Sequence, residues 1–465
     1  MSQQSMRGPS ELARYRGLNP RSWEQSVRAA KVMPGGTTRT TTYFEPYPVS
    51  VVRGDGSRVW DVDGNERVDF LGNYSASILG AAHPKIVAAV AEQVGRGTGF
   101  STANCEEVAL AELLVNRIRS VESIRFCSSG TEATMFAMRL ARVTTGRPVV
   151  ARFEGGYHGT HDFAEVSIHP EEGVWGSAGA PVPVAESSGT HPAALEYSLV
   201  LPFNDLENTV RLLDAHRERV GGVIVEPMLG VGGMIPPSTG FLEGLREATR
   251  RLGMVLIFDE VISLRLAAGG AQDYFGIEPD LTTMGKIIGG GLPVAAFGGR
   301  REIMEVLNPS RPGAVPQGGT FNGNPLGMAA GRAQMEELSQ AALTALNNRG
   351  DAVRTRLAEA FRVYEVPAQV TGVGSLMNIH FTGTPVSGYR EAARASKQVM
   401  AEFFLGMLNE GYLIAPRGMV ALSLAMTDKD LEGFVAAVER LCASHAEDWV
   451  ATIDGSDGAQ PHYCF

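Results

Sequence analysis

The sequence predicts an α/β fold, with a mostly parallel central sheet in a large domain and a second, smaller domain. Between about residues 105 and 300, short and almost wholly apolar runs alternate with amphipathic helical stretches, which is typical of parallel strands buried on both faces. The chain also has 465 residues, of which 44% are hydrophobic and 20% are charged. This is enough apolar material for a large core in more than one domain.

The N-terminal part is expected to fold into a short helix and a small antiparallel meander. The helix is expected over Ser22–Val32, in a polar, Arg-rich stretch that the MPGG of 33–36 ends. Three β-like runs separated by turn residues then predict the meander: Val49–Arg53, Ser57–Asp61 and Arg67–Leu71. A further helix is expected over Pro84–Val94.

Four apolar runs are the expected strands of the parallel sheet: Ser123–Cys127, Pro148–Phe153, Gly222–Val225 and Met254–Phe258. Beyond about residue 330 we expect helix to Val363, then a mixed region that includes Gly372–Leu376, and further helices. The predicted domains are an N-terminal segment over 1–75, a large domain over 76–335 and a C-terminal domain over 336–465. The tail over 454–465 is expected to be loosely ordered.

Composition and charge exclude several classes of protein. The formal net charge of −10 argues against the basic footprint of a nucleic-acid-binding protein. No apolar run approaches the length of a membrane span, and the first residues lack a signal-peptide core, so a cytoplasmic protein is expected. Four Cys without CxxC spacing predict free thiols. The HGTHD of 158–162 has metal-like spacing, but no Cys or carboxylate set completes a shell, so no metal is expected.

The segment over 258–291 indicates the chemistry. Asp259 ends an apolar run, where α/β sheets place ligands, although a helix cap or a structural ion pair also explains it. Lys286 lies between Gly285 and an Ile-Ile-Gly-Gly-Gly run, so we expect it to be desolvated, with a lowered pKa and nucleophilic character. A nucleophilic Lys with a buried Asp fits pyridoxal phosphate (PLP): Lys binds the cofactor aldehyde, and Asp keeps the pyridine nitrogen protonated.

Three other turns follow apolar runs and can complete a cofactor site. Ser129-Gly130-Thr131 opens an amphipathic helix, so it offers N–H groups and a hydroxyl to a phosphate, or simply caps the helix. Tyr157, on the Gly-rich turn over 155–159, can stack on a planar ring. Glu226 brings a carboxylate to the same edge of the sheet, or supports the turn that it ends.

As a set, SSGTEAT, GGYHG, VEP, FDEV, TMGKIIGGG and GGTFNGNP resemble the class III (subgroup II) aminotransferases of PLP fold type I, over about residues 20–440. The resemblance implies a small domain formed from both termini. It also implies that Lys286 carries the cofactor, that Asp259 pairs with the pyridine nitrogen and that Tyr157 stacks on the ring. It assigns further cofactor contacts to Ser129, Gly130, Thr131, His158, Glu226, Val261 and Thr320. Thr320 would reach the phosphate of the neighbouring subunit, which implies a homodimer with shared active sites.

Two subfamilies fit this resemblance. The stretch over 269–304 looks like glutamate-1-semialdehyde 2,1-aminomutases. Three segments depart from their usual motifs: Gly36–Thr40 in place of N-S-P-V-R, Asn73–Ala76 in place of S-W-G-P, and Ala415–Val420 in place of S-A-F-E-A-G-F. In the last of these segments a base, Arg417, thus replaces the acid of the aminomutases. The same positions look like aromatic β-amino acid (β-phenylalanine) aminotransferases, which combine an early Arg with a P-R-G-apolar-V-x-L-S-L segment.

The predicted function is ping-pong transfer of the amino group of a β-amino acid, β-phenylalanine-like, to a 2-oxo acid such as 2-oxoglutarate. Lys286 is the expected general base. Arg39 and Arg417 are expected to bind carboxylates, although each is one of 36 arginines and a solvated surface group also explains it. Tyr74 is a candidate wall residue of the substrate site, or part of the core. The alternatives are an aminomutase-like isomerase and a catalytically idle binding module.

Overall fold

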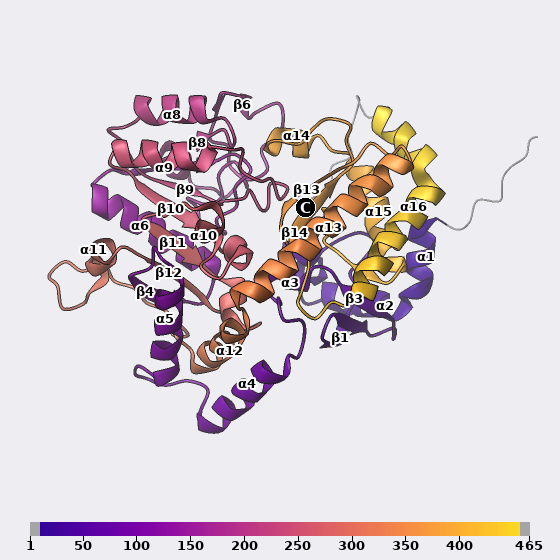
Figure 1. Ribbon diagram of the computed structural model, residues 1–465, viewed down its shortest axis with the longest axis horizontal. Coiled ribbons are helices and arrows are strands. Elements are labelled where there is room, and N and C mark those ends of the chain that lie inside the picture. The colour runs from indigo at the N-terminus through magenta and orange to yellow at the C-terminus, as the bar shows by residue number, and fades with distance from the viewer. Residues whose placement is uncertain (1–9, 456–465) are drawn as a thin grey trace, which may run out of the picture.

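A computed structural model of the chain describes residues 10–455, and the statements below concern this part of the chain. Its largest sheet has seven strands in the order β4-β12-β11-β10-β9-β5-β8 (Figure 1). These strands are β4 (Ser123–Cys127), β5 (Val149–Phe153), β8 (Ser198–Leu201), β9 (Val220–Val225), β10 (Val255–Asp259), β11 (Leu281–Met284) and β12 (Ala295–Gly299).

The sheet is mostly parallel, which confirms the predicted fold class. Strands β8, β5, β9, β10 and β11 pair in parallel, and β12 is antiparallel to both β11 and β4. The four predicted strands are β4, β5, β9 and β10, within two residues at each end. The prediction missed β8, β11 and β12. The last of these has the sequence Ala-Ala-Phe-Gly-Gly, so it carries none of the β-branched residues that typically indicate a strand.

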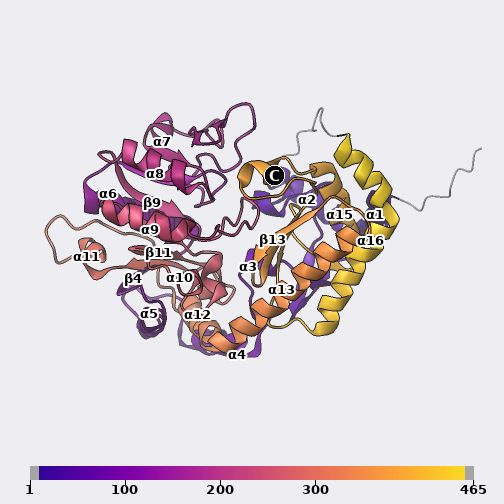
Figure 2. The same ribbon diagram turned by 45° about the horizontal axis from the view of Figure 1, so that its top comes forward.

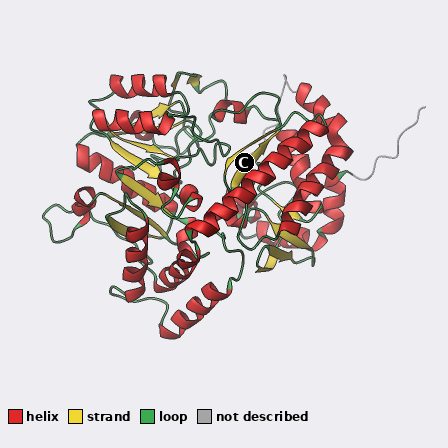
Figure 3. Ribbon diagram, viewed as in Figure 1, coloured by secondary structure: helices red, strands yellow, loops and turns green. Residues whose placement is uncertain are grey.

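Helices cover both faces of this sheet (Figure 3). Helix α6 (Gly130–Thr145) contacts six of its strands, and its apolar side chains pack with those of Ile224 and Ile257. Helices α8 (Leu206–Ala215) and α9 (Phe241–Arg251) pack with Val223, Val225 and Leu256. Neighbouring residues of a strand therefore enter two different cores, which explains why the strand sequences are apolar without alternation.

The two terminal parts of the chain share a second half of the molecule (Figures 1 and 2). β1 (Val51–Asp55), β2 (Arg58–Asp61) and β3 (Glu66–Asp69) form the predicted antiparallel meander, and β15 (Tyr412–Leu413) adds to β3 in parallel. A three-stranded sheet is built from β13 (Gln369–Val373), β14 (Leu376–His380) and β16 (Met419–Ala421). The domain boundaries at residues 75 and 335 stay a prediction.

The remaining helices pack around these sheets. They are α1 (Glu11–Leu18), α2 (Pro20–Ala30), α3 (Gly72–Ser75), α4 (Pro84–Arg96), α5 (Cys105–Arg117), α7 (Pro192–Glu196), α10 (Ala271–Phe275), α11 (Arg301–Met304), α12 (Pro325–Glu337), α13 (Gln340–Val363), α14 (Tyr389–Ala393), α15 (Lys397–Asn409) and α16 (Asp428–Asp454). The predicted N-terminal helix is α2, which begins two residues earlier than expected and ends at Ala30. The prediction missed α1, in which Tyr15 is the buried residue, so no apolar periodicity indicates it.

Cys105, Cys127 and Cys442 are free thiols, as predicted. Cys464 and residues 456–465 of the predicted loose tail lie outside the described residues. None of the helices within residues 10–455 is long and apolar enough to cross a membrane.

Candidate active site

The polar residues singled out in the sequence lie where strands of the seven-stranded sheet end. Asp259 is the last residue of β10, and Glu226 directly follows β9. Lys286 comes two residues after β11, and Tyr157 and His158 follow β5. Because β5, β9, β10 and β11 run in parallel, their carboxyl ends meet at one edge of the sheet. The fold therefore gathers these side chains at the edge where such sheets bind ligands.

Three donors fix the carboxylate of Asp259, which is 4% exposed. Its Oδ2 lies 2.8 Å from Nδ1 of His158, and its Oδ1 accepts hydrogen bonds from Thr283 Oγ1 at 3.0 Å and from the Val261 amide at 3.2 Å. None of these donors is an ammonium or a guanidinium, and β10 ends here without a helix to cap. The negative charge of Asp259 is thus held in place rather than neutralised by a cation.

His158 is the buried partner of Asp259. Burial lowers the pKa of its imidazole, and the carboxylate of Asp259 opposes this shift. A neutral ring that faces a carboxylate donates from Nδ1, which leaves Nε2 unprotonated. Thr134 Oγ1 anchors the backbone by donating to the His158 carbonyl at 2.5 Å. His158 thus acts as a fixed donor to Asp259.

Lys286 is a partly buried amine with unusual backbone geometry. Burial lowers the pKa of its ammonium from 10.5 to about 8, against the opposing charges of Asp259 and Glu226. Its φ is +48°, in the left-handed region that costs an L-residue roughly 1–3 kcal/mol and that concentrates at functional sites. These properties are those of a nucleophile or general base that works near neutral pH.

Glu226 supports the turn that carries Tyr157. Its carboxylate accepts hydrogen bonds from the Tyr157 amide at 3.0 Å and from the Gly230 amide at 3.2 Å. Burial and the neighbouring charge of Asp259 raise the pKa of Glu226 to about 8. These hydrogen bonds fit a supporting role for Glu226. Its negative charge also raises the pKa of Lys286.

The turn at 129–131 begins helix α6. Ser129 Oγ accepts a hydrogen bond from the Glu132 amide at 3.2 Å, so this hydroxyl caps the helix. Val261 packs against the same turn, since a Cβ at Gly130 would lie 3.3 Å from its methyl carbons. Thr131 Oγ1 accepts from the Thr160 amide at 3.2 Å. What this turn offers an anion is therefore chiefly the N–H groups of the first helical turn, rather than the Ser129 hydroxyl.

Arg39, Tyr74 and Arg417 meet at a second wall. The Arg417 guanidinium lies 5.8 Å from the centre of the Tyr74 ring, and its charge lowers the pKa of Lys286. Arg39 Nη1 donates to Asn73 Oδ1 at 3.0 Å, and the Tyr74 hydroxyl donates to the Thr41 carbonyl. Tyr74 thus links the loop of Arg39 to Arg417. Arg39 is exposed, whereas Arg417 is partly buried.

The turn that carries Tyr74 is strained. Gly72, Asn73, Tyr74 and Ser75 have consecutive φ values of +55°, +50°, +55° and +74°, a short left-handed turn within α3. Left-handed backbone costs L-residues roughly 1–2 kcal/mol each. Asp69 stabilises its start, where Oδ1 accepts from the Leu71 and Gly72 amides, both at 2.9 Å. The wall that presents Tyr74 is therefore held by tertiary contacts rather than by local preference.

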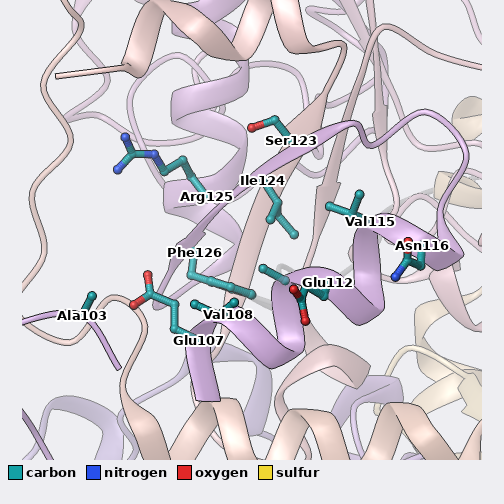
Figure 4. Close-up of a pocket in the computed structure, with 11 residues that line it drawn as sticks. Ala103, Glu107, Val108, Glu112, Val115, Asn116, Ser123, Ile124, Arg125 and Phe126 are labelled. Atoms are coloured by element: carbon teal, nitrogen blue, oxygen red, sulfur yellow. The ribbon is translucent and has the colours of Figure 1, made fainter. Parts of the chain in front are cut away.

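Thr320 is exposed on the loop that precedes α12. Asn322 of this loop accepts from Ser128 Oγ at 3.3 Å, and the Gly323 carbonyl accepts from Asn104 at 2.9 Å. Next to this loop, α5 and β4 enclose a hollow, with Val108, Val115, Ile124 and Phe126 among its lining residues (Figure 4). None of the predicted site residues lines this hollow, so it is separate from the site around Lys286.

Some residues that shape the site carry little or no signal in the sequence. Thr283 pairs with Asp259 across β10 and β11. The two adjacent threonines in the otherwise apolar strand β11 were the sequence signal that could have identified it. Asn73 and Thr41 bind Arg39 and Tyr74 through contacts between the wall and the early loop. No local pattern in the sequence indicates those two contacts.

The lowered pKa of Lys286 predicts the pH dependence of cofactor capture. Below pH 8 the amine is mostly protonated and cannot attack an aldehyde, and above it the amine is mostly neutral. The rate at which apo-enzyme captures PLP, followed by stopped-flow absorbance, is expected to rise with pH to a plateau, with a midpoint near 8 rather than 10.5. The charge of Glu226 raises this pKa, but Glu226 has a pKa of about 8 itself and is only partly charged at the midpoint, so Glu226→Gln should move the midpoint modestly to lower pH. A midpoint above 10 would contradict a desolvated lysine.

Comparison with known proteins supports the same chemistry. A family model described as "Aminotransferase class-III" matches residues 41–441. Glutamate-1-semialdehyde 2,1-aminomutase of Methanothermobacter thermautotrophicus is 40% identical over 424 residues, which cover 90% of this chain and 98% of that protein. An ω-transaminase structure from Sphaerobacter thermophilus is 43% identical with a TM-score of 0.88, and covers 91% of this chain and 98% of its own. A β-phenylalanine aminotransferase structure from Variovorax paradoxus is 38% identical with a TM-score of 0.85, and covers 94% and 97%.

Proposed function

The chain belongs to the class III aminotransferases, and from this premise we propose that it transfers the amino group of an aromatic β-amino acid to a 2-oxo acid such as 2-oxoglutarate. It is a PLP-dependent enzyme of the aminotransferase type. The observation that carries the proposal is the pair of arginines near Tyr74: Arg417 lies over its ring, and Arg39 binds the neighbouring Asn73. An enzyme that binds two different carboxylates in turn needs such groups.

The residues present fit the cofactor. When bound, PLP supplies a ring that accepts electrons from the carbon that bears the amino group. Lys286 would hold the cofactor covalently, and its amine would act as the general base at the carbon that bears the amino group. Asp259 would keep a proton on the pyridine nitrogen, with its carboxylate held in place by His158. Tyr157 would contact the ring, and the N-terminus of α6 would bind the phosphate.

The two arginines are assigned to different carboxylates of the substrates. A guanidinium binds a carboxylate through two parallel hydrogen bonds, and Arg39 and Arg417 approach Tyr74 from different segments of the chain. Arg417 lies close enough to the Tyr74 ring for a cation–π contact. This contact gives the guanidinium a resting place when the aryl group of a donor occupies the pocket. The same pocket then accepts the second carboxylate of 2-oxoglutarate, as a ping-pong reaction requires.

An isomerase of the aminomutase type is the second candidate. Identity of 40% over almost the full length of a curated aminomutase supports it at least as strongly as the overall likeness to transaminases supports amino transfer. The residues at the substrate wall favour transfer, because Arg417 places a base where the aminomutase motif has an acid. The two candidates share Lys286 and Asp259 and differ in what they require. Only the transaminase needs a separate 2-oxo acid.

We also propose that the enzyme is a homodimer with shared active sites. The side chains of Phe100, Val108 and Phe321 are 51%, 55% and 69% exposed. Their loops adjoin, since Asn324 binds the Thr98 carbonyl at 2.8 Å and Asn104 binds the Gly323 carbonyl. A second copy that covers this surface would bury these apolar side chains and bring Thr320 to the partner's phosphate site.

A single-turnover absorbance experiment tests the proposed reaction. PLP-loaded enzyme is mixed with each enantiomer of 3-amino-3-phenylpropanoate without an acceptor. We expect one enantiomer to convert the cofactor to its aminated form and 2-oxoglutarate to reverse the change. Conversion by glutamate 1-semialdehyde or 4,5-diaminovalerate, with none by either β-amino acid, would overturn the proposal in favour of the isomerase.

Arg417→Gln sharpens the same experiment. Loss of the guanidinium should weaken binding of 2-oxoglutarate by about tenfold to a hundredfold, as expected for a charge-assisted pair worth ~1.5–3 kcal/mol. Arg362→Gln is the matched control, because Arg362 is a surface residue that pairs with Glu359 on its own helix. Equal acceptor binding in both variants would show that Arg417 does not bind the acceptor.

A further inference from the structure

Arg265 is a buried guanidinium that has no carboxylate partner among residues 10–455. It is 1% exposed, in the short 3₁₀ helix over Ser263–Leu266 that follows β10. None of the ion pairs within residues 10–455 includes it, and burial alone lowers its pKa to about 9. A buried charge without an opposite charge is costly unless its donors are all used. The hydrogen bonds of Arg265 therefore indicate what it does.

The guanidinium joins three segments that are far apart in the sequence. Its Nε donates to Ser375 Oγ at 3.2 Å, its Nη1 donates to the Ser75 carbonyl at 3.3 Å, and its Nη2 donates to the Leu422 carbonyl. A planar fork of five N–H groups can span three such acceptors, which the compact ammonium of a lysine cannot do.

Two of these segments carry the proposed substrate residues. Ser75 directly follows Tyr74 and is the last residue of the left-handed turn. Leu422 directly follows β16, within the Pro416–Leu424 segment that contains Arg417. The third segment connects the two strands of a hairpin, and there the Ser375 carbonyl accepts from the Leu422 amide at 2.9 Å. Arg265 thus ties the Tyr74 wall and the Arg417 segment to the chain that leaves β10 after Asp259.

The left-handed turn needs this support at its end. Asp69 already stabilises the start of the turn through the Leu71 and Gly72 amides. At the end, the Ser75 carbonyl accepts from Arg265, and the Ser75 hydroxyl is buried without a hydrogen-bond partner within residues 10–455. Without Arg265, a turn of three consecutive L-residues with positive φ would relax, and Tyr74 would move with it.

We propose that Arg265 is a positioning residue for substrate binding, which holds the backbone that carries Tyr74 and the backbone that carries Arg417 in fixed relation to each other and to Asp259 and Lys286. It touches neither substrate nor cofactor and acts through the left-handed turn and the Pro416–Leu424 segment. The proposal rests on the proposed function, because it takes the Tyr74 and Arg417 wall as the substrate site.

The test compares Arg265→Gln and Arg265→Lys with Arg117→Gln. Arg117 is the matched control, because its guanidinium also donates to three acceptors, the carbonyls of Ala268, Met335 and Leu338, none of which adjoins the substrate wall. Both Arg265 variants should bind the unreactive carboxylate 3-phenylpropanoate, measured by spectral titration of the PLP-loaded enzyme, about tenfold to a hundredfold more weakly. Their PLP affinity and cofactor spectrum should stay within about twofold of wild type. Arg117→Gln should lower only the melting temperature.

A strain-relief variant separates positioning from simple stability. Ser75→Gly removes the Cβ from a residue at φ +74°, so the turn no longer needs the clamp as strongly. Added to Arg265→Gln, it should recover ligand affinity at least about fivefold. Glycine also gives the unfolded chain more conformational freedom, which lowers the stability of the folded protein. If Arg265→Gln fails to fold, Arg265→Lys carries the same comparison, since it keeps the charge and most of the volume.

Three results would overturn the proposal: unchanged carboxylate affinity in the Arg265 variants, equal weakening in Arg117→Gln, or no recovery with Ser75→Gly. The measurement does not depend on the reaction that the enzyme performs. If wild type converts glutamate 1-semialdehyde but neither β-amino acid, the proposed reaction is wrong. The Arg265 comparison is then made with 4,5-diaminovalerate as the carboxylate ligand and has the same expected outcome.

Discussion

Replacing Lys286 with alanine is expected to abolish multiple turnover, with a fall in kcat of ~10⁴-fold, the upper end of the range that a general base contributes. The reason is that one amine performs two tasks: it binds the cofactor and it moves the proton at the reacting carbon. Its lowered pKa of about 8 leaves a minor fraction of the amine neutral at physiological pH, which is far more than the ordinary pKa of 10.5 would allow. The measurement is steady-state kinetics with PLP added in excess, so that weaker cofactor binding does not limit the rate.

Lys85→Ala provides the control for Lys286→Ala. Lys85 is exposed and pairs with Glu337 on the surface, where an ion pair contributes ~0–1 kcal/mol. Its loss should leave kcat unchanged within about twofold. Circular dichroism and melting temperature should be near wild type for both variants, because Lys286 makes no ion pair with any residue of 10–455 that would hold the fold together. Full multiple-turnover activity in Lys286→Ala would refute the assignment of this residue and the proposed mechanism with it.

The parallel sheet and the chemistry at its edge were predictable from sequence for a common reason. A strand buried on both faces is apolar throughout, so a polar residue at its end, such as Asp259, stands out. Lys286 stood out because lysine is rare in this chain and because its neighbours are apolar or glycine. Both signals are local, and the structure places both residues at the same sheet edge.

The substrate wall was less predictable because it depends on contacts between distant segments. The left-handed backbone at Asn73 and Tyr74 is stabilised by Asp69 and Arg265, about 200 residues apart in the chain. Arg265 itself lies in the stretch Leu264-Arg265-Leu266, where nothing in the sequence distinguishes a buried clamp from an exposed charge. The register of β10 against β11 could not be predicted from the sequence either, so Thr283 could not be placed opposite Asp259.

Asp259→Asn is expected to reduce kcat by about 10²–10³-fold, the range seen when a preorganised charge that stabilises a transition state is removed. The fold should change little. An asparagine can accept from Thr283 and from the Val261 amide through its oxygen, as Asp259 does. His158 then needs only to shift its proton from Nδ1 to Nε2 so that Nδ1 accepts from the new amide. The expected change in the free energy of unfolding is ~1 kcal/mol.

Glu260→Gln is the control that distinguishes loss of negative charge at the site from the replacement of a buried acid elsewhere. Glu260 is the next residue, fully buried, and accepts from the Ala271 amide and from Gln272 on the far side of the strand end. Its variant should lower the melting temperature and leave kcat near wild type. Asp259→Asn should do the reverse.

Asp259→Asn should also leave a signature on Lys286 that a merely structural residue would not produce. The carboxylate of Asp259 raises the pKa of Lys286 against the effect of burial. Its removal should therefore lower this pKa below 8, so the midpoint for cofactor capture moves to lower pH while kcat falls. Unchanged kinetics with a lowered melting temperature would instead make Asp259 a structural residue. An unmoved midpoint with reduced kcat would limit its role to the pyridine nitrogen, because the charge would then act on the cofactor ring and not on the amine.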